Sequence, residues 1–209
     1  MDKNIQGFNN FLNTRFPNIT DIKHTFKICS KHGNNEYLVD SQMQTINFDK
    51  LTEWYEKPKP QSADSLSFSD DFLYLIEFKS GDPTTNEYKL DKLIENVVGK
   101  INDSDDTLTT MYSEAFADDT TRLKQNFCLV VDAKKIGLPV LVSTLASLSL
   151  SNNYSNDSKE KILFEKVQPD LKKGIKSPEH FSKIDIWYST LFEQYLKAKY
   201  IRSSVGSFT

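Results

Sequence analysis

A strongly apolar run of the chain ends abruptly in two charges. The run Phe72-Leu-Tyr-Leu-Ile76 is followed directly by Glu77-Phe78-Lys79. Because side chains alternate along a strand, Glu77 and Lys79 share one face of it. Both faces of the run begin with apolar residues, which is typical of a central strand covered on both sides. A buried charge without a partner costs several kcal/mol, so each of the two needs a partner or a ligand.

A third charged residue is expected beside this pair. Asp64 begins the segment Asp64-Ser-Leu-Ser-Phe68, which alternates between polar and apolar residues like a strand. The intervening residues, Ser69-Asp70-Asp71, are typical of a turn. If that turn closes an antiparallel hairpin, Asp64 folds back opposite the Glu77–Lys79 end. The sequence therefore predicts two carboxylates and one ammonium group at one edge of a sheet.

Two carboxylates and a lysine in one place suit metal-assisted hydrolysis. Oxygen ligands from Asp64 and Glu77 would hold a hard cation such as Mg²⁺, which takes one or two carboxylates and keeps several waters. Such an ion lowers the pKa of a bound water and stabilises charge on a scissile phosphate. Lys79 would orient or deprotonate that water, or neutralise the developing negative charge. A plain salt bridge among the same residues is the alternative.

These residues and their spacing resemble the PD-(D/E)XK nuclease superfamily. Asp64, twelve further residues and then Glu77-Phe78-Lys79 on an apolar strand match its motif, and an amphipathic helix and a second buried strand follow. The resemblance covers residues 48–133. It implies an α/β (α+β) fold of the restriction-endonuclease-like type, in which helices flank a mixed central sheet with an αβββαβ core.

The resemblance also implies a function. It implies a metal-dependent nuclease that hydrolyses phosphodiester bonds of nucleic acid, DNA in preference to RNA, with Mg²⁺ or Mn²⁺ as cofactor. Asp64 and Glu77 would be the metal ligands and Lys79 the catalytic lysine. Some members add a glutamate from the helix before the first strand, and Glu53 is the candidate here. Many nucleases of this type cut duplexes as dimers, so a homodimer is a further expectation.

Two other segments match parts of the motif. Glu87-Tyr88-Lys89 matches it on a predicted helix, where the geometry is unsuitable, and Asp132-Ala133-Lys134 competes with it at the end of the next buried strand. Ala63 stands where the motif has proline. These departures and the acidic pI of about 5.7 leave a second hypothesis. It is a catalytically inactive nuclease-like protein that binds or inhibits another macromolecule.

The remaining periodicities predict the elements that would position these residues. The expected helices are 5–16, 48–57, 86–103, about 108–125 and 178–200. The expected strands are 64–68, 72–80 and 126–133, with a hairpin over 24–41. The run 140–150 fits a helix or a strand, and 151–158 is typical of a loop. We expect a single domain, 1–209, with its nuclease-like core at 48–133 and a C-terminal extension, 137–209, that ends in the helix 178–200.

The composition is that of a globular protein, 38% hydrophobic and 26% charged, with a formal net charge of −3. The N-terminal segment lacks the basic and apolar regions of a signal peptide, and no apolar run approaches the roughly 18 residues of a membrane span. Cys29 and Cys128 have no second Cys or His at metal-binding spacing, so we expect two reduced thiols. These features together predict a cytoplasmic protein that does not bind a membrane.

Overall fold

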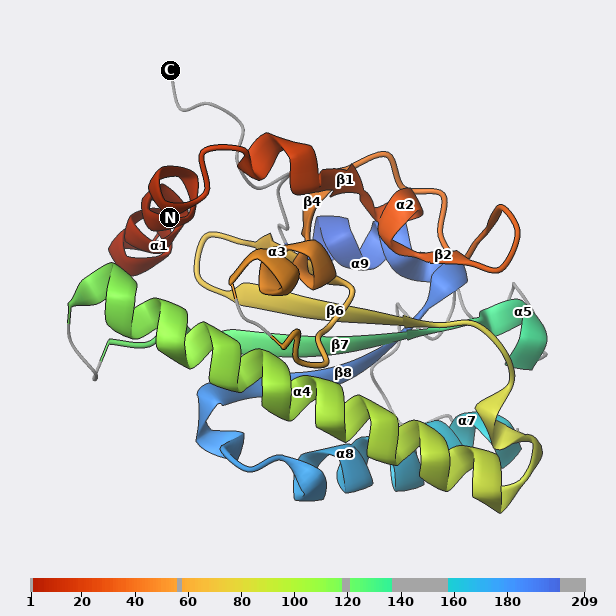
Figure 1. Ribbon diagram of the computed structural model, residues 1–209. Helices are drawn as coiled ribbons and strands as arrows, with labels where there is room; N and C mark the ends of the chain where they lie inside the picture. Colours follow the sequence, from red (N-terminus) through yellow and green to blue (C-terminus); the bar gives the residue numbers. More distant parts are fainter. Residues whose placement is uncertain (1, 56–57, 118–120, 137–157, 200–209) are drawn as a thin grey trace.

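The fold is a mixed α/β structure built on a six-stranded sheet (Figure 1). The computed structural model describes residues 2–55, 58–117, 121–136 and 158–199. The strands are β1 (Lys23–Thr25), β2 (Lys31–His32), β3 (Glu36–Tyr37), β4 (Gln44–Asn47), β5 (Ser65–Phe68), β6 (Leu73–Lys79), β7 (Gln125–Val131) and β8 (Phe181–Tyr188). The α-helices are α1 (Lys3–Arg15), α2 (Phe26–Cys29), α3 (Phe48–Tyr55), α4 (Glu87–Phe116), α5 (Ala133–Ile136), α7 (Ser158–Ile162), α8 (Gln168–Gly174) and α9 (Phe192–Ala198). Shorter helical turns are η1 (Ile19–Ile22), η2 (Pro83–Thr85), η3 (Leu163–Val167), η4 (Pro178–His180) and η5 (Ser189–Leu191).

The sheet combines antiparallel and parallel strands. Its order is β1-β4-β5-β6-β7-β8. The pairs from β1 to β6 are antiparallel, whereas β6, β7 and β8 run parallel to one another. β6 therefore lies in the interior of the sheet, and its side chains from Leu73 to Phe78 are buried, as expected for a strand covered on both faces. Strands β2 and β3 form a separate short hairpin.

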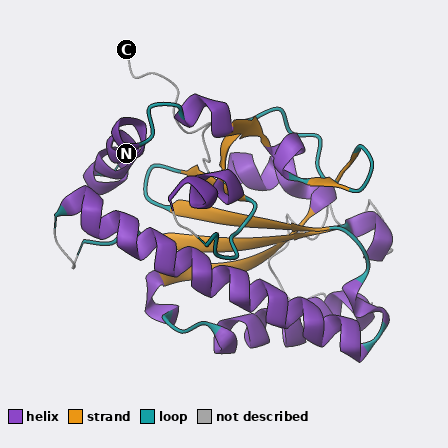
Figure 2. Ribbon diagram, viewed as in Figure 1, coloured by secondary structure: helices purple, strands orange, loops and turns teal. Residues whose placement is uncertain are grey.

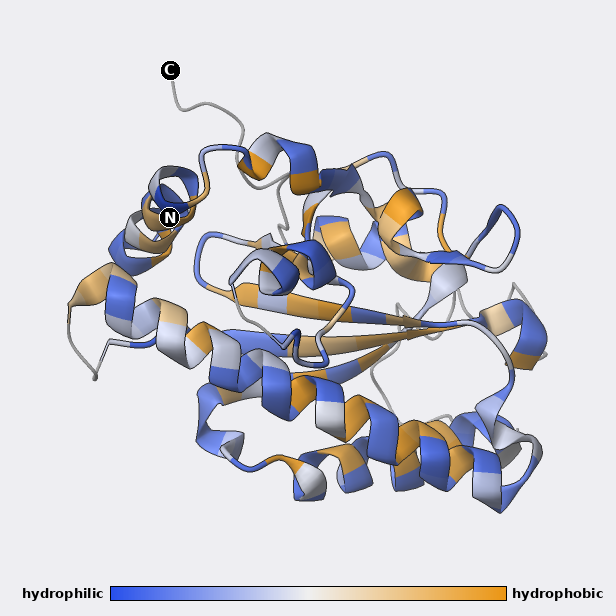
Figure 3. Cartoon of the chain, viewed as in Figure 1, coloured by the Kyte–Doolittle hydropathy of each residue, from blue (hydrophilic) through white to orange (hydrophobic). Residues whose placement is uncertain are grey.

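Helices cover both faces of the sheet (Figures 1 and 2). On one face, α1, α3, α4 and α8 pack over a large apolar core that includes Leu75 of β6. On the other face, α2 and α9 contribute Phe26 and Phe192 to a smaller core. Figure 3 shows β6 as hydrophobic over most of its length and hydrophilic towards its carboxyl end. Glu77 lies on the face of Leu75, and hence on the side that α4 covers.

The predicted hairpin between β5 and β6 is confirmed. The two strands are antiparallel with Ser65 opposite Ile76, so Asp64 comes opposite Glu77. Ser69 helps to close the turn between them, because its main-chain N–H donates to a carbonyl oxygen at 2.8 Å. Helices α1 and α3 and strand β7 also lie where the sequence predicts them, with ends that differ by a few residues.

The prediction of separate helices at 86–103 and 108–125 is wrong, because the single helix α4 continues without a break to Phe116. The polar stretch in its middle does not interrupt it, since side chains there bind groups from distant parts of the chain. Ser104, for example, is fully buried and accepts a hydrogen bond of 3.0 Å from the main-chain N–H of Ala63. Ser104, which lies between the two predicted helices, therefore makes a tertiary contact inside one continuous helix.

The predicted helix 178–200 is also wrong. Residues 181–188 form strand β8, and α9 occupies only 192–198. The apolar residues of this segment fit both a helical and an alternating pattern, and parallel pairing with β7 along the whole strand decides in favour of the strand. The sheet consequently extends beyond 48–133 on both sides, because β1, β4 and β8 lie outside that range.

The hairpin expected over 24–41 is present only in its centre, where β2 and β3 pair. Gly33 and Asn35 in its turn have positive φ angles of 59° and 62°, a conformation that these two residue types tolerate. The first predicted arm instead bends into helix α2, and β1 pairs with β4. The local sequence therefore predicted the turn but not the partners of the strands.

Two further predictions concern residues 140–158 and membrane-spanning segments. The run 140–150 and nearly all of the loop 151–158 lie outside the described residues. Within the described residues, neither the 30-residue helix α4 nor any other helix is both long and apolar enough to cross a membrane.

A close approach of α8 to α4 provides a test of this packing. A Cβ atom at Gly174, the last residue of α8, would lie 2.7 Å from Val98 Cγ2, which is closer than such atoms can approach. We predict that Gly174→Ala lowers the free energy of unfolding by about 1–3 kcal/mol, as expected when volume is forced into a packed interior. The measurement is urea denaturation.

Gly99→Ala in α4 is the matched control for that variant. A Cβ atom there meets only the flexible side chain of Gln61, at 3.3 Å. Alanine has the higher helix propensity, so this variant should be neutral or slightly stabilising. Equal stability of the two alanine variants would contradict the described packing of α8 on α4.

Candidate active site

The structure brings Asp64, Glu77 and Lys79 together at the carboxyl end of β6. Lys79 Nζ lies 2.7 Å from Glu77 Oε1. Asp64 Oδ2 accepts a hydrogen bond of 2.7 Å from the main-chain N–H of Phe78, the residue between the other two. This arrangement follows from the hairpin register, which sets Asp64 opposite Glu77. Three of the four predicted site residues therefore form one cluster.

A second lysine, which the sequence patterns did not reveal, completes the cluster. Lys100 of α4 places Nζ 2.8 and 2.9 Å from the two carboxylate oxygens of Glu77 and 3.3 Å from Asp64 Oδ1, and so bridges the two acids. A signal was present in the sequence. Lys100 follows Leu93 by seven positions and Val97 by three, and therefore lies within the apolar stripe of the helix. A lysine on the buried face of an amphipathic helix indicates a buried partner.

A hydrogen bond between α4 and the start of β5 positions this lysine. The main-chain N–H of Ala63 donates to Ser104 Oγ at 3.0 Å. Ser104 lies one turn beyond Lys100, and Ala63 immediately precedes Asp64. The bond therefore fixes the helix against the strand at the height where Lys100 meets Asp64. This contact therefore joins the middle of α4 to the residue next to Asp64.

The cluster is strongly desolvated. The side chain of Glu77 is 1% exposed and that of Asp64 is 19% exposed. Burial and the charge of Glu77 raise the pKa of Asp64 to about 7, although Lys100 and the N–H of Phe78 act in the opposite direction. Burial lowers the pKa of Lys100, but the charges of Glu77 and Asp64 outweigh burial and leave that pKa above its usual value. Two carboxylates held this close need positive charge between them.

The fourth predicted residue, Glu53, does not join the cluster. Its side chain is exposed and pairs with Lys50, 3.6 Å away on the same helix. Helix α3 begins beside the cluster, because the main-chain N–H of Phe48 donates to the carbonyl oxygen of Asp64 at 3.2 Å. Asp49, in the first turn of α3, is consequently the acid of this helix whose charge acts on the lysine of α4.

The two competing motifs have local structural contacts. Asp132 Oδ1 accepts hydrogen bonds from the main-chain N–H groups of Lys134 and Lys135, at 3.1 and 3.3 Å, and so caps the short helix α5. Glu87 lies in the first turn of α4 and pairs with Lys166 at 3.4 Å. These contacts account for the acids of both segments without a catalytic role.

The donor set of the cluster fits a divalent cation of the Mg²⁺ type. Three carboxylate oxygens, one from Asp64 and two from Glu77, already converge on a single positive charge, Lys100 Nζ. Mg²⁺ binds through one or two carboxylates and keeps several waters, so two acids are sufficient. In the described part of the chain no group of three or more His, Cys, Asp or Glu side chains is arranged to hold a metal ion. A metal at this site would therefore have two protein carboxylates and water as ligands.

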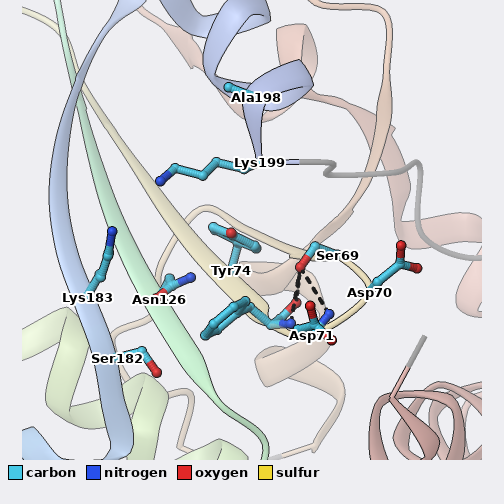
Figure 4. Close-up of a pocket in the computed structure, with 10 residues that line it drawn as sticks. Ser69, Asp70, Asp71, Tyr74, Asn126, Ser182, Lys183, Ala198 and Lys199 are labelled. Atoms are coloured by element: carbon cyan, nitrogen blue, oxygen red, sulfur yellow. Dashed lines mark hydrogen bonds between the residues drawn. The ribbon is translucent and has the colours of Figure 1, made fainter. Parts of the chain in front are cut away.

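A separate hollow of about 300 Å³ lies at the other end of β6 (Figure 4). It is lined from the β5–β6 turn, β7, β8 and α9, and its charged residues are of both signs, namely Asp70, Asp71, Lys183 and Lys199. Tyr74 lines this hollow, and side chains at positions 74 and 77 of a strand point to opposite faces of the sheet. The hollow is therefore distinct from the cluster.

Comparison of the chain with protein-family models, with curated proteins and with solved structures gives no match. What the cluster does is therefore inferred from its geometry and chemistry.

The bridging contact makes a prediction about stability. Lys100→Met leaves Asp64 and Glu77 side by side with less compensating charge, so we predict a loss of roughly 2–4 kcal/mol in the free energy of unfolding, measured in urea. Adding Asp64→Asn removes one of the two repelling carboxylates and should recover part of that loss. Additive effects of the two substitutions would show that the contact has no energetic role.

Proposed function

We propose that the protein is a metal-dependent nuclease that hydrolyses phosphodiester bonds of nucleic acid, with DNA as the preferred substrate. The observation that carries the proposal is the convergence of two carboxylates and two lysines at the carboxyl end of one central strand. A buried acid, Glu77, and a half-buried acid, Asp64, lie at hydrogen-bonding distance from the same ammonium group and form a site of negative charge that suits a divalent ion. Titratable groups whose pKa is shifted by burial and by a neighbouring charge, as that of Asp64 is, are frequent at functional sites.

The order of elements supports the proposal. Helix α1, strands β4, β5 and β6, helix α4 and strand β7 occur in an αβββαβ order along the chain. Strand β1, helix α2 and the β2–β3 hairpin lie between α1 and β4, and α3 lies between β4 and β5. Apart from these insertions, this is the order implied by the resemblance to PD-(D/E)XK nucleases, with β4 as the first strand of the βββ unit and β1 as an additional antiparallel strand beside it. A restriction-endonuclease-like fold is therefore part of the proposal.

Each residue of the cluster has a distinct role in this mechanism. Asp64 and Glu77 would hold Mg²⁺ or Mn²⁺, which when bound supplies a Lewis acid and a water of lowered pKa. The N–H of Phe78 orients Asp64, and burial in the sheet fixes Glu77. Lys79 is 29% exposed, so its ammonium group is accessible to a phosphate oxygen. It would orient the attacking water or neutralise charge that develops on the phosphate.

Cleavage assays test the proposal. Wild-type protein is expected to cut duplex DNA with Mg²⁺ or Mn²⁺ and to lose the activity when EDTA is added. Asp64→Asn, Glu77→Gln and Lys79→Met should each lower the rate by about 10²–10⁴-fold, the usual contribution of a positioned proton-transfer or charge-stabilising group. RNA in parallel reactions measures the substrate preference.

Lys89→Met is the matched control, because Glu87-Tyr88-Lys89 carries the same Glu-x-Lys motif on the exposed start of α4. This variant should retain wild-type activity. Activity that survives Glu77→Gln and Lys79→Met unchanged would exclude the proposed site, even if the preparation cleaves DNA. The homodimer and the cytoplasmic location predicted from the sequence are not needed for this test.

A second candidate function rests on the same cluster. Lys79 and Lys100 balance the charges of Asp64 and Glu77, so the four residues could form a closed ion-pair network in an inactive, nuclease-like binding or inhibitory protein. In that case neither Mg²⁺ nor Mn²⁺ binds at Asp64, and no variant of the cluster changes cleavage. Calorimetric titration of wild type and Asp64→Asn with Mn²⁺ separates the two functions.

A further inference from the structure

We propose that Lys100 is a built-in cation that competes with the divalent metal for Asp64 and Glu77, so that metal loading requires the lysine side chain to leave the site. The inference rests on the proposed nuclease function and adds a regulatory step to it. It concerns which residue controls access of the metal, rather than which residues bind it.

The ammonium group of Lys100 contacts both acids. Lys100 Nζ lies within 3.3 Å of three carboxylate oxygens that belong to both acids. Lys79 Nζ pairs with Glu77 Oε1 alone in the described contacts, at 2.7 Å. Of the two lysines, therefore, Lys100 occupies the point shared by both carboxylates.

A metal ion and the ammonium group of Lys100 would exclude each other at these carboxylates. The three oxygens that Lys100 Nζ contacts belong to the two acids that would hold Mg²⁺, so the ammonium group and the ion would compete for the same oxygens. The charges of the cluster also oppose binding of a metal ion while Lys100 stays in place. Asp64, Glu77, Lys79 and Lys100 carry two charges of each sign, and beside them only Asp49 of α3 is described as a further negative charge acting on Lys100. A divalent ion added while Lys100 stays in place would therefore leave an excess of positive charge.

The side chain of Lys100 can leave the cluster without disturbing the fold. Its stem has four flexible carbons, and its side chain is 21% exposed, so a route to solvent is open. The backbone of α4 is held separately, one turn away, by the hydrogen bond between Ser104 and Ala63. Displacement therefore needs a change of side-chain rotamers and no movement of the helix.

The consequence is a measurable gain in metal affinity when the competitor is removed. Calorimetric titration of the full chain with Mn²⁺ should show binding at least tenfold tighter in Lys100→Met and Lys100→Gln than in wild type. Lys89→Gln, an exposed lysine of the same helix, is the matched control and should bind like wild type. Asp64→Asn added to each Lys100 variant should abolish the binding and so assign it to this site.

The outcomes separate this inference from the proposed function. Tighter Mn²⁺ binding in both Lys100 variants than in wild type supports the inference. Equal binding by wild type and the variants overturns the inference and leaves the nuclease proposal intact. Absence of binding in every variant overturns both.

A labelling experiment on the wild-type chain avoids any loss of stability in the variants. Reductive methylation followed by mass spectrometry reports how exposed each amine is. We expect methylation of Lys100 to rise at least threefold when Mn²⁺ is added, with Lys89 unchanged. Mn²⁺ that binds in calorimetry but leaves the methylation of Lys100 unchanged would overturn the inference.

Discussion

The structure depends on the way in which one buried carboxylate, Glu77, is compensated. Its side chain is 1% exposed and lies in the central strand of the sheet, where an isolated charge costs several kcal/mol. Lys100 and Lys79 provide the compensating charge, and Asp64 adds a second acid that the main chain of β6 holds in place. The positions of β5, β6 and α4 relative to one another are those that bring these four side chains together.

Helix α4 links the fold to the candidate chemistry. It is long enough to pack across the sheet against α1 and α8 (Figure 1). Lys100, in its middle, contacts Glu77 near the end of β6. The hydrogen bond between Ser104 and Ala63 fixes the position of Lys100, because it joins the helix to the residue before Asp64. A cluster built from a strand pair and a crossing helix keeps a defined geometry even though it carries four charges. The two lysine side chains, 29% and 21% exposed, are the most exposed members of the cluster.

The sequence predicted the parts of this arrangement that are local. The Asp64–Glu77 pairing follows from one turn and two alternating strands, and these features are readable over fewer than twenty residues. Lys100 was missed because it reaches the acids from a helix that comes later in the chain, and nothing in the local pattern joins them. Glu53 was expected on the right helix but one turn too far along it, since the start of α3, and not its middle, lies beside Asp64.

The two errors in secondary structure have the same origin. The gap left between the two predicted helices is helical, and Ser104 within it binds the main chain before β5, which is distant in sequence. Segment 178–200 has a helical apolar pattern, but its first part pairs with β7 and becomes a strand. In both cases tertiary contacts override a local preference, as expected where periodicity fits two structures. The hairpin was predictable because its partners are neighbours.

The most direct test of the account is a crystal structure of the protein soaked in Mn²⁺, with anomalous scattering used to locate the ion. The account predicts an anomalous peak between the carboxylates of Asp64 and Glu77, with Lys100 Nζ moved away from both and Lys79 still beside the site. A crystal saturated with Mn²⁺ in which Lys100 still bridges the two acids, with no anomalous peak between them, would contradict it.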